Sequence, residues 1–208
     1  MPKIGAFEEH SDAYDDWFDN NQLAYAAELK AVRQLLPDKT AVGMEIGVGS
    51  GKFAVPLGIK VGVEPSAQMA AKSKQLGIEV HSGVAENLPF DAEQFDFTLM
   101  VTTICFVDDV VQSFREALRV LKPGGSIIVA YVDKASELGQ KYLANRSKSK
   151  FYQQATFFST TEILDYLKKA GFGATQVKQT LIASSSDQTV LDGYGQGGFV
   201  VVKAVTAL

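Results

Sequence analysis

A glycine-rich turn between two apolar segments constrains the fold of this chain more than any other feature. The turn reads Glu-Ile-Gly-Val-Gly-Ser-Gly over residues 45–51 and follows an apolar segment that begins at Ala41. Glycine at every second position lets the backbone turn sharply and approach a ligand that a Cβ would obstruct. The next apolar segment, Ile59 to Val63, ends in Glu64, whose carboxylate can accept both hydroxyl protons of a ribose. The pattern predicts one half of a nucleoside-binding α/β sheet.

The spacing of the glycines indicates which kind of nucleoside fits. A dinucleotide-binding loop reads Gly-x-Gly-x-x-Gly. Here the third glycine, Gly51, comes one residue early, and Lys52 stands where the glycine would be. The loop therefore favours a cofactor without a pyrophosphate over a nicotinamide dinucleotide.

Helix and strand patterns alternate through the first 132 residues. Strands are expected over 41–46, 59–63, 78–81, 95–101 and 126–132, and helices over 22–36, 52–57, 66–76 and 109–121. The segment 52–57 allows only a short helix, because Pro56 and Gly58 interrupt it. The alternation predicts a Rossmann-like, doubly wound α/β sheet with helices on both faces and a ligand outside the carboxyl ends of the strands.

The two ends of the chain differ from this alternating core. Residues 1–20 mix aromatic and acidic side chains and predict a cap, and 133–158 predict an insertion over the strand ends. A helix over 160–170 and strands near 174–183 and 199–205 give about seven strands in all. We expect a single domain over 1–208, made of the cap and first helix (1–38), a cofactor-binding core (39–132), the insertion (133–158) and the C-terminal helix and strands (159–208).

Composition excludes several classes of protein. The 208 residues are 46% apolar and 21% charged, which is ordinary for a soluble globular protein. A net charge of −4 gives no overall attraction to nucleic acid or to an anionic membrane. The lone cysteine, Cys105, excludes an intrachain disulfide and is consistent with a reducing compartment, and neither a signal-peptide pattern nor a membrane-spanning apolar run is seen, so a cytoplasmic location is expected.

Four segments together resemble the class I S-adenosylmethionine-dependent methyltransferases, in the small-molecule, type 11-like branch that includes quinone and sterol methylating enzymes. They are the loop 45–51 with Glu64, Gly-Val-Ala-Glu-Asn-Leu-Pro-Phe at 83–90, Gln-Phe-Asp-Phe at 94–97, and Arg-Val-Leu-Lys-Pro-Gly-Gly at 119–125. The resemblance implies S-adenosylmethionine as cofactor, S-adenosylhomocysteine as product, and a last strand that inserts antiparallel between its neighbours. It covers residues 40 to 132 well.

The resemblance also implies roles for individual residues. Glu64 would hold the ribose hydroxyls, and Glu45 would support the loop or the cofactor's ammonium group. The implied cofactor-binding residues are Tyr14, Glu45, Gly47, Gly49, Gly51, Glu64, Pro65, Ala85, Glu86, Thr102 and Thr103. The short helix after the glycine loop departs from the family pattern and leaves one wall of the site undefined.

The acceptor is expected to be a small organic molecule, because the segments around the strand ends are aromatic and of mixed polarity. The substrate-binding residues expected are Trp17, Phe18, Ile104, Phe106 and Tyr131, together with the aromatic insertion and the polar loop 184–198. Four aspartates, at 12, 15, 16 and 19, could favour a cationic amine, although acids on an exposed helix are common. No metal site is predicted, and the oligomeric state is left open.

Transfer of an already activated methyl group is an in-line displacement that needs mainly alignment of the reactants, worth roughly 7–11 kcal/mol. No catalytic residue is assigned: His10, His81, Asp108 and Tyr131 lack a diagnostic spacing, and Cys105 fits a small apolar residue better than a nucleophile. Two alternatives remain, which are a module that binds the cofactor without transferring methyl and a nicotinamide oxidoreductase.

Overall fold

The structure is a computed structural model that describes residues 3–183 and 188–206. Its centre is one eight-stranded sheet in the order β3-β2-β1-β4-β5-β8-β6-β7. The strands are β1 (Gly43–Ile46), β2 (Val61–Val63), β3 (Glu79–His81), β4 (Phe95–Val101), β5 (Leu121–Val132), β6 (Phe172–Ile182), β7 (Leu191–Asp192) and β8 (Gly197–Thr206). The order confirms a Rossmann-like α/β fold, and the strand beyond the seven expected is the two-residue β7.

Strands β3, β2, β1, β4 and β5 are parallel, as the alternating pattern predicted. The last long strand, β8, lies antiparallel between β5 and β6. This confirms the antiparallel last strand between two neighbours that the resemblance implied. Because β1 pairs with both β2 and β4, its carboxyl end lies at the middle of the parallel half of the sheet.

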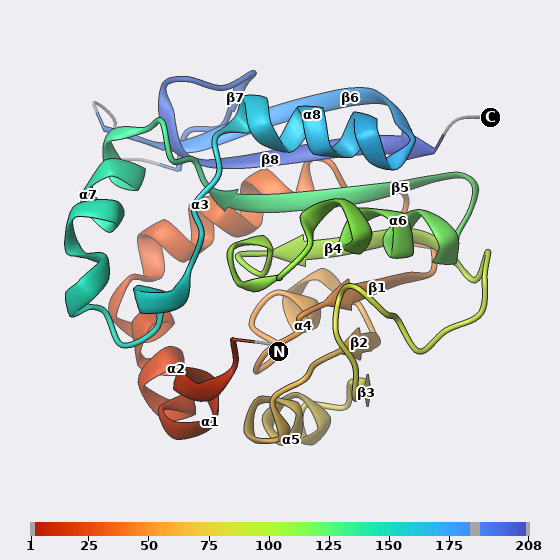
Figure 1. The fold of residues 1–208 in the computed structure, drawn as a ribbon, viewed down its shortest axis with the longest axis horizontal. Coiled ribbons are helices and arrows are strands. Elements are labelled where there is room, and N and C mark those ends of the chain that lie inside the picture. The colour runs from red at the N-terminus through yellow and green to blue at the C-terminus, as the bar shows by residue number, and fades with distance from the viewer. Residues whose placement is uncertain (1–2, 184–187, 207–208) are drawn as a thin grey trace.

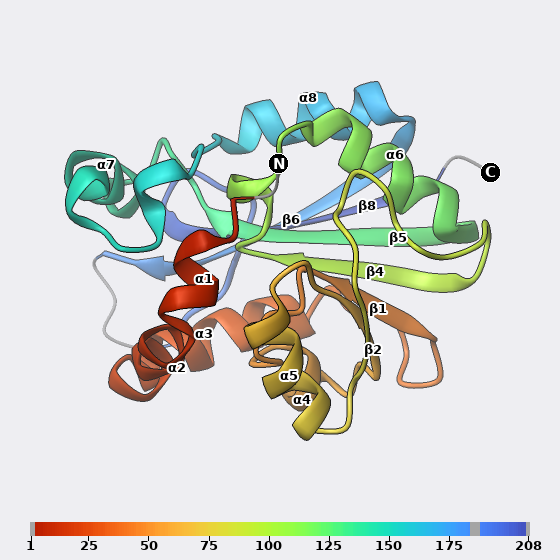
Figure 2. The same cartoon turned by 60° about the horizontal axis from the view of Figure 1, so that its bottom comes forward.

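Helices cover both faces of the sheet (Figures 1 and 2). The helices are α1 (Gly5–Glu9), α2 (Ser11–Asn20), α3 (Gln22–Arg33), α4 (Ala54–Leu57), α5 (Ala67–Gln75), α6 (Val110–Val120), α7 (Glu137–Asn145) and α8 (Thr160–Ala170). Short 3-10 helices between these elements span Ile104–Phe106, Arg146–Lys148 and Tyr152–Gln154. In Figure 2, α6 and α8 lie on one face and α3, α4 and α5 on the other.

Each face has its own core, because successive side chains of a strand point to opposite faces. On β5, Ile127 and Val129 pack with Phe114 of α6, whereas Ile128 packs with Val32 of α3. This two-sided burial explains why β4 and β5 read as nearly continuous apolar runs rather than alternating ones.

Local signals fix where several helices begin and end. The hydroxyl of Ser66 accepts a hydrogen bond from the Met69 backbone N–H, so it caps α5. Helix α8 begins with a capping box in which Ser159 and Glu162 satisfy each other's backbone N–H groups. It ends at Gly171, whose φ of 105° is a left-handed conformation that suits glycine.

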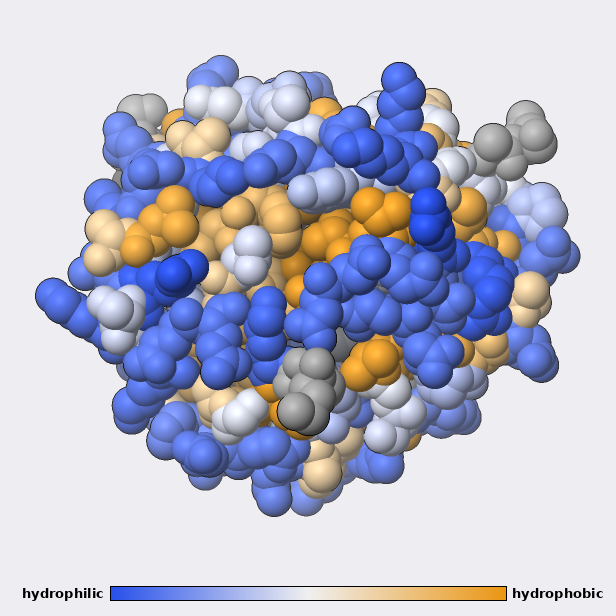
Figure 3. All heavy atoms as spheres, in the orientation of Figure 1, coloured by the Kyte–Doolittle hydropathy of each residue, from blue (hydrophilic) through white to orange (hydrophobic). Residues whose placement is uncertain are grey.

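The cap and the insertion gather at one end of the molecule, where α1, α2 and α7 lie (Figures 1 and 2). Figure 3 shows a largely polar surface in this orientation, with a band of apolar residues across its middle. None of the helices in the described ranges is both long enough and apolar enough to cross a membrane.

Removal of a core side chain should test this packing. Phe114 is 0% exposed between α6 and the sheet, so Phe114→Ala should lower the free energy of unfolding by about 3–5 kcal/mol. The neighbouring Arg115 is exposed, and Arg115→Ala should change it by no more than about 0.5 kcal/mol. Urea denaturation followed by circular dichroism measures both, and equal midpoints for the two variants would contradict the packing.

Candidate functional site

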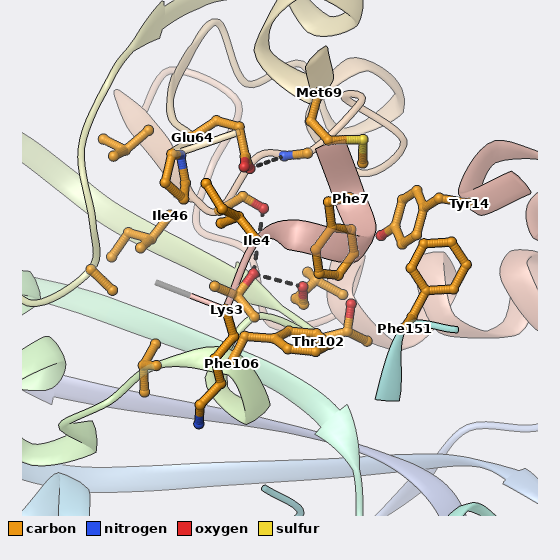
Figure 4. A pocket seen from close by; sticks show the side chains of 18 of the residues that line it. Lys3, Ile4, Phe7, Tyr14, Ile46, Glu64, Met69, Thr102, Phe106 and Phe151 are labelled. Carbon is orange, nitrogen blue, oxygen red and sulfur yellow. Dashed lines mark hydrogen bonds between the residues drawn. The ribbon is translucent and has the colours of Figure 1, made fainter. Parts of the chain in front are cut away.

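A cavity of about 560 Å³ lies at the carboxyl ends of β1, β2 and β4, and Ile46, Val63 and Val101 from these ends line it. Figure 4 shows how Glu64, Tyr14 and Phe151 surround the cavity from the sheet, the cap and the insertion. This is where an open α/β sheet binds its ligands.

The glycine loop forms one wall of the cavity. Gly47 and Gly49 line it, with φ values of +70° and +54° that favour glycine. A Cβ on Gly47 would approach the Thr103 hydroxyl oxygen to 2.4 Å. Gly51 is outside the lining, and a Cβ there would lie 2.9 Å from the Cδ1 of Ile78. Two glycines of the loop therefore face the cavity, while the third allows the loop to pack against the residues before β3.

Glu64 joins this loop to the end of β2 and also faces the cavity. Its Oε2 accepts a hydrogen bond from the Gly49 N–H at 2.8 Å, and its Oε1 accepts one from the Ser66 N–H at 2.9 Å. The side chain is 7% exposed. Burial raises the pKa of Glu64, and the two backbone hydrogen bonds oppose that rise. Each carboxylate oxygen can still accept another hydrogen bond from the cavity side.

Glu45 lies behind the loop rather than in the cavity lining. The side chain is buried, and no partner for its Oε2 is present in the described part of the chain. Burial raises the pKa of this carboxyl well above its usual range, against a weaker opposing contribution from the Ala54 backbone N–H. The resemblance implied that Glu45 supports the loop or the cofactor's ammonium group, and the structure places Glu45 outside the cavity lining.

The opposite wall comes from the segment after β3 and from the end of β4. Ala85 and Glu86 line the cavity, as does Pro65 after β2. The Oε1 of Glu86 accepts hydrogen bonds from the Asp108 and Asp109 N–H groups at 2.7 and 3.2 Å. The Glu86 carboxylate therefore holds the start of α6.

Thr102 and Thr103, at the end of β4, also line the cavity. Thr102 has a φ of +50°, which is strained for a β-branched residue and costs about 1–3 kcal/mol. Burial raises the pKa of Tyr14, and the Thr102 side chain opposes that rise. Tyr14 lines the cavity together with Thr102, so the cap reaches the end of the central strand.

Ion pairs hold the cap over the glycine loop. The ammonium of Lys72, on α5, lies 2.6 Å from Asp12 and 2.8 Å from Asp15. The Ser50 hydroxyl, within the loop, donates a hydrogen bond to Asp15 at 2.5 Å. Asp16 and Asp19 are exposed. These contacts account for the acidic cluster as docking and surface charge, so it gives no support to a cation site.

Aromatic residues complete the wall that the short helix α4 leaves undefined. Phe53 lines the cavity, and its ring centroid lies 6.2 Å from that of Phe18 and 5.5 Å from that of Tyr25. The Tyr25 hydroxyl donates a hydrogen bond to the Lys52 carbonyl. The ammonium of Lys52 lies 5.6 Å from the Phe18 ring centroid.

The structure brings only some of the expected acceptor residues into the cavity. Trp17, Phe18 and Phe106 line it. Ile104 and Tyr131 instead border a much smaller cavity, of about 10 Å³, and the Tyr131 hydroxyl donates a hydrogen bond to Thr160 at 3.0 Å. Within the polar loop, residues 188–198 are absent from the lining of the larger cavity, and 184–187 lie outside the described residues.

Two further candidates for chemistry, His81 and Cys105, lie outside the lining of the larger cavity and make other contacts, whereas Asp108 belongs to that lining. The Nε2 of His81 lies 2.9 Å from the Glu79 carboxylate. Cys105 donates a hydrogen bond from Sγ to the Thr102 carbonyl, and burial raises its pKa to about 12. A thiol with that pKa is neutral at physiological pH, which supports the interpretation of Cys105 as a small apolar residue.

Several lining residues were not singled out by sequence reasoning. Phe7, Met69, Val84 and Tyr142 add apolar surface to the cavity. The most informative of them is Glu28 on α3, which lines the cavity although it is only 5% exposed. A charged residue on the buried side of an otherwise apolar helix face was the available signal, because Glu28 shares the buried face of α3 with Ala31 and Val32.

Burial alone raises the pKa of Glu28 from 4.5 to about 8. The folded protein therefore binds a proton at Glu28 more tightly than the unfolded chain does, and ionisation of Glu28 destabilises the fold as the pH rises from about 4.5 towards 8.

Glu28→Gln should remove this penalty, because the amide resembles the protonated acid. We expect the variant to be more stable than the parent by under about 1 kcal/mol at pH 5 and by on the order of 3 kcal/mol at pH 7. Urea unfolding across this pH range measures the difference. Glu137 on α7 is exposed, so Glu137→Gln is the matched control and should change the stability by no more than about 0.5 kcal/mol at pH 7. A Glu28→Gln variant that is less stable than the parent at pH 7 would contradict the assigned environment.

Known proteins resemble this chain over its core and over its full length. Residues 44–129 match the family model described as methyltransferase domain. An uncharacterized protein of Methanocaldococcus jannaschii is 40% identical over 97% of this chain and 98% of its own length. A demethylmenaquinone methyltransferase of Chlorobaculum parvum is 31% identical over 51% of this chain and 47% of its own length.

A solved structure from Thermotoga maritima superposes on nearly the whole molecule. It is described as an S-adenosylmethionine-dependent methyltransferase, possible histamine N-methyltransferase. It is 49% identical to this chain, with a TM-score of 0.94, and the match covers 98% of this chain and 100% of that one.

Proposed function

The chain belongs to the S-adenosylmethionine-dependent methyltransferases, and from this we propose that it transfers the methyl group to a small organic acceptor by in-line displacement. The observation that carries the proposal is the single cavity that joins Glu64 and the glycine loop to the end of β4 and to an aromatic wall. A nucleoside and a second small molecule could share such a cavity, since ligand sites of this size are typically apolar with a few polar groups that fix orientation.

The residues present fit the cofactor. Glu64 would bind the ribose hydroxyls, because its carboxylate faces the cavity and its hydrogen bonds leave acceptor capacity. Gly47 and Gly49 would lie against the methionine portion and the ribose, where a side chain would obstruct the approach. Glu45 and Gly51 would support the loop from behind.

The other side of the cavity would bind the adenine and the reactive end. Pro65, Ala85 and Glu86 would lie along the nucleoside. The Glu86 carboxylate would position the start of α6 through the hydrogen bonds that it accepts from the Asp108 and Asp109 N–H groups. Thr102 and Thr103 would lie under the reactive sulfur, with Tyr14 closing over them from the cap. When bound, S-adenosylmethionine supplies a methyl group that is already activated by its attachment to a positively charged sulfur.

The protein's own contribution is then alignment and the exclusion of water. The cap is fastened to the glycine loop by Asp15, and Phe7 on α1 contacts Phe106 and Phe151, with ring centroids 5.0 and 5.5 Å apart. These contacts close the cavity between three segments that are distant in sequence. Orientation of the two reactants can provide roughly 7–11 kcal/mol of the lowering of the barrier.

A small acceptor is supported by the lining and by the relatives. Trp17, Phe18 and Phe106 offer apolar, flat contact surface. Relatives whose names include an acceptor are a demethylmenaquinone methyltransferase, a phosphoethanolamine N-methyltransferase and a possible histamine N-methyltransferase, among others. We further propose that residues 1–208 act as one domain, and that the reaction takes place in the cytoplasm, where a lone buried cysteine stays reduced.

Calorimetric titration of the purified protein tests the cofactor site. S-adenosylmethionine and S-adenosylhomocysteine should both bind, and Glu64→Gln should weaken binding by about 10- to 100-fold, because one carboxylate that accepts two ribose hydroxyls is lost. Glu79→Gln, at an exposed glutamate of β3, is the matched control and should bind like the parent.

NADH is titrated in parallel. Binding of NADH without the adenosyl ligands would favour the oxidoreductase alternative, and no binding of either adenosyl ligand would refute the proposal. Thermal unfolding of each variant verifies that it is folded.

A further inference from the structure

The carboxylate of Glu28 is buried, faces the cavity and has no partner in the part of the chain that the structure describes. It is 5% exposed and belongs to the cavity lining. Among the described residues it makes no hydrogen bond and no ion pair, and burial is the only cause that shifts its pKa. Buried carboxylates are normally paired or hydrogen-bonded, since an unpaired one is costly to keep. A partner that arrives with a ligand would resolve this cost.

Glu28 differs in this respect from the other two buried glutamates near the loop. Glu64 is held by two backbone N–H groups, and Glu45 lies outside the cavity lining. Glu28 alone of the three combines access to the cavity with a complete lack of hydrogen bonds in the described part of the chain.

Much of the cavity lining near the cap and the insertion is aromatic, and no cation of residues 3–183 or 188–206 forms an ion pair with Glu28, although Lys3 lines the same cavity. Tyr14 on α2, Tyr142 on α7 and Tyr152 in the insertion line the same cavity as Glu28, and Tyr25 precedes it by three residues on α3. Burial is the largest cause that raises the pKa of each of these four phenols, and the negative charge of Glu28 is a minor one. The pKa of Tyr25 is raised to about 12, so this phenol is neutral at physiological pH. Lys52, on the same wall, faces the Phe18 ring and Asp15 instead.

A buried carboxylate in a cavity lined by aromatic rings is complementary to one kind of group, a cationic amine. The negative charge pairs with the ammonium, and the rings attract it through cation–π interactions that strengthen as water is excluded. An anionic ligand would be repelled by Glu28, and a neutral one would leave the carboxylate unpaired.

We propose that Glu28, with the rings of Trp17, Phe18, Tyr142 and Tyr152, forms a subsite for a positively charged amine of the methyl acceptor. The proposal rests on the function proposed above and narrows its acceptor to amines. The same ammonium chemistry occurs at the amino-acid end of S-adenosylmethionine, so the test must separate the two sources.

Proton linkage gives the subsite a signature that a structural glutamate would lack. With a pKa near 8, Glu28 is mostly protonated at pH 6 to 7, and it must ionise to pair with an ammonium. Amine binding should therefore release a proton, and the affinity should rise by about tenfold per pH unit between pH 6 and 7 and level off above pH 8. The facing tyrosines stay neutral over this range and do not contribute to the slope.

The experiment is calorimetry on the full chain saturated with S-adenosylhomocysteine, at pH 6, 7 and 8. The probes are histamine, tryptamine and 2-phenylethylamine, with 2-phenylethanol as the uncharged counterpart of the last. We expect at least one amine to bind with the stated pH dependence, and 2-phenylethanol to bind at least about tenfold more weakly than its amine. Glu28→Gln should lose at least about tenfold in amine affinity and all of the pH slope, while Glu137→Gln should match the parent.

Each contrary result has a distinct meaning. If S-adenosylhomocysteine binds and none of the amines does, the amine subsite is refuted while the proposed function stands. If Glu28→Gln weakens S-adenosylhomocysteine rather than the amines, the carboxylate serves the cofactor and the acceptor assignment is refuted. If S-adenosylhomocysteine does not bind to the parent protein, the proposed function fails and this inference fails with it.

Discussion

The pair of hydrogen bonds that Glu64 accepts from Gly49 and Ser66 holds together the part of the structure on which the site depends. One bond fixes the glycine loop, and the other fixes the residue that caps α5. Since Ser73 of α5 donates a hydrogen bond back to the Gly49 carbonyl, the loop is held from two sides. Lys72 on the same helix fastens the cap through Asp12 and Asp15. The carboxylate that faces the cavity thus also positions the elements that close it.

Several features of the site are costly to the folded state, and they occur together. Glu28 and Glu45 are buried carboxyls with raised pKa values, and Thr102 holds a left-handed φ at the end of β4. Strain and unpaired polar groups persist where the surrounding structure determines them and where a function needs them. Glu28 and Thr102 line the same cavity. The two large cores on either side of the sheet provide the stability that offsets these local costs.

The core of the fold was predictable because its signals are local. The strand over 95–101 follows from a run of apolar residues and the helix over 160–170 from apolar residues at helical spacing, and the structure has both with these bounds. The two-residue β7 depends on pairing with β6 and leaves no periodic signal. Tyr131 illustrates a second limit, because its side chain is committed by a hydrogen bond to Thr160, on a helix much later in the chain. Glu28 was predictable in principle, since it interrupts an apolar helix face.

The cavity has two halves of different origin, and this difference explains what each kind of similarity can reveal. The glycine loop, Glu64, Ala85 and Thr102 lie within the segment 44–129 that defines the family. Glu28, the cap and the insertion lie outside it and supply most of the aromatic wall. A core that binds one cofactor constrains the first half, whereas each acceptor imposes its own demands on the second. The M. jannaschii and T. maritima proteins match this chain over its full length, including the position of Glu28. An acidic residue at that position in such a relative would indicate a similar acceptor. Relatives that match only the core inform on the cofactor alone.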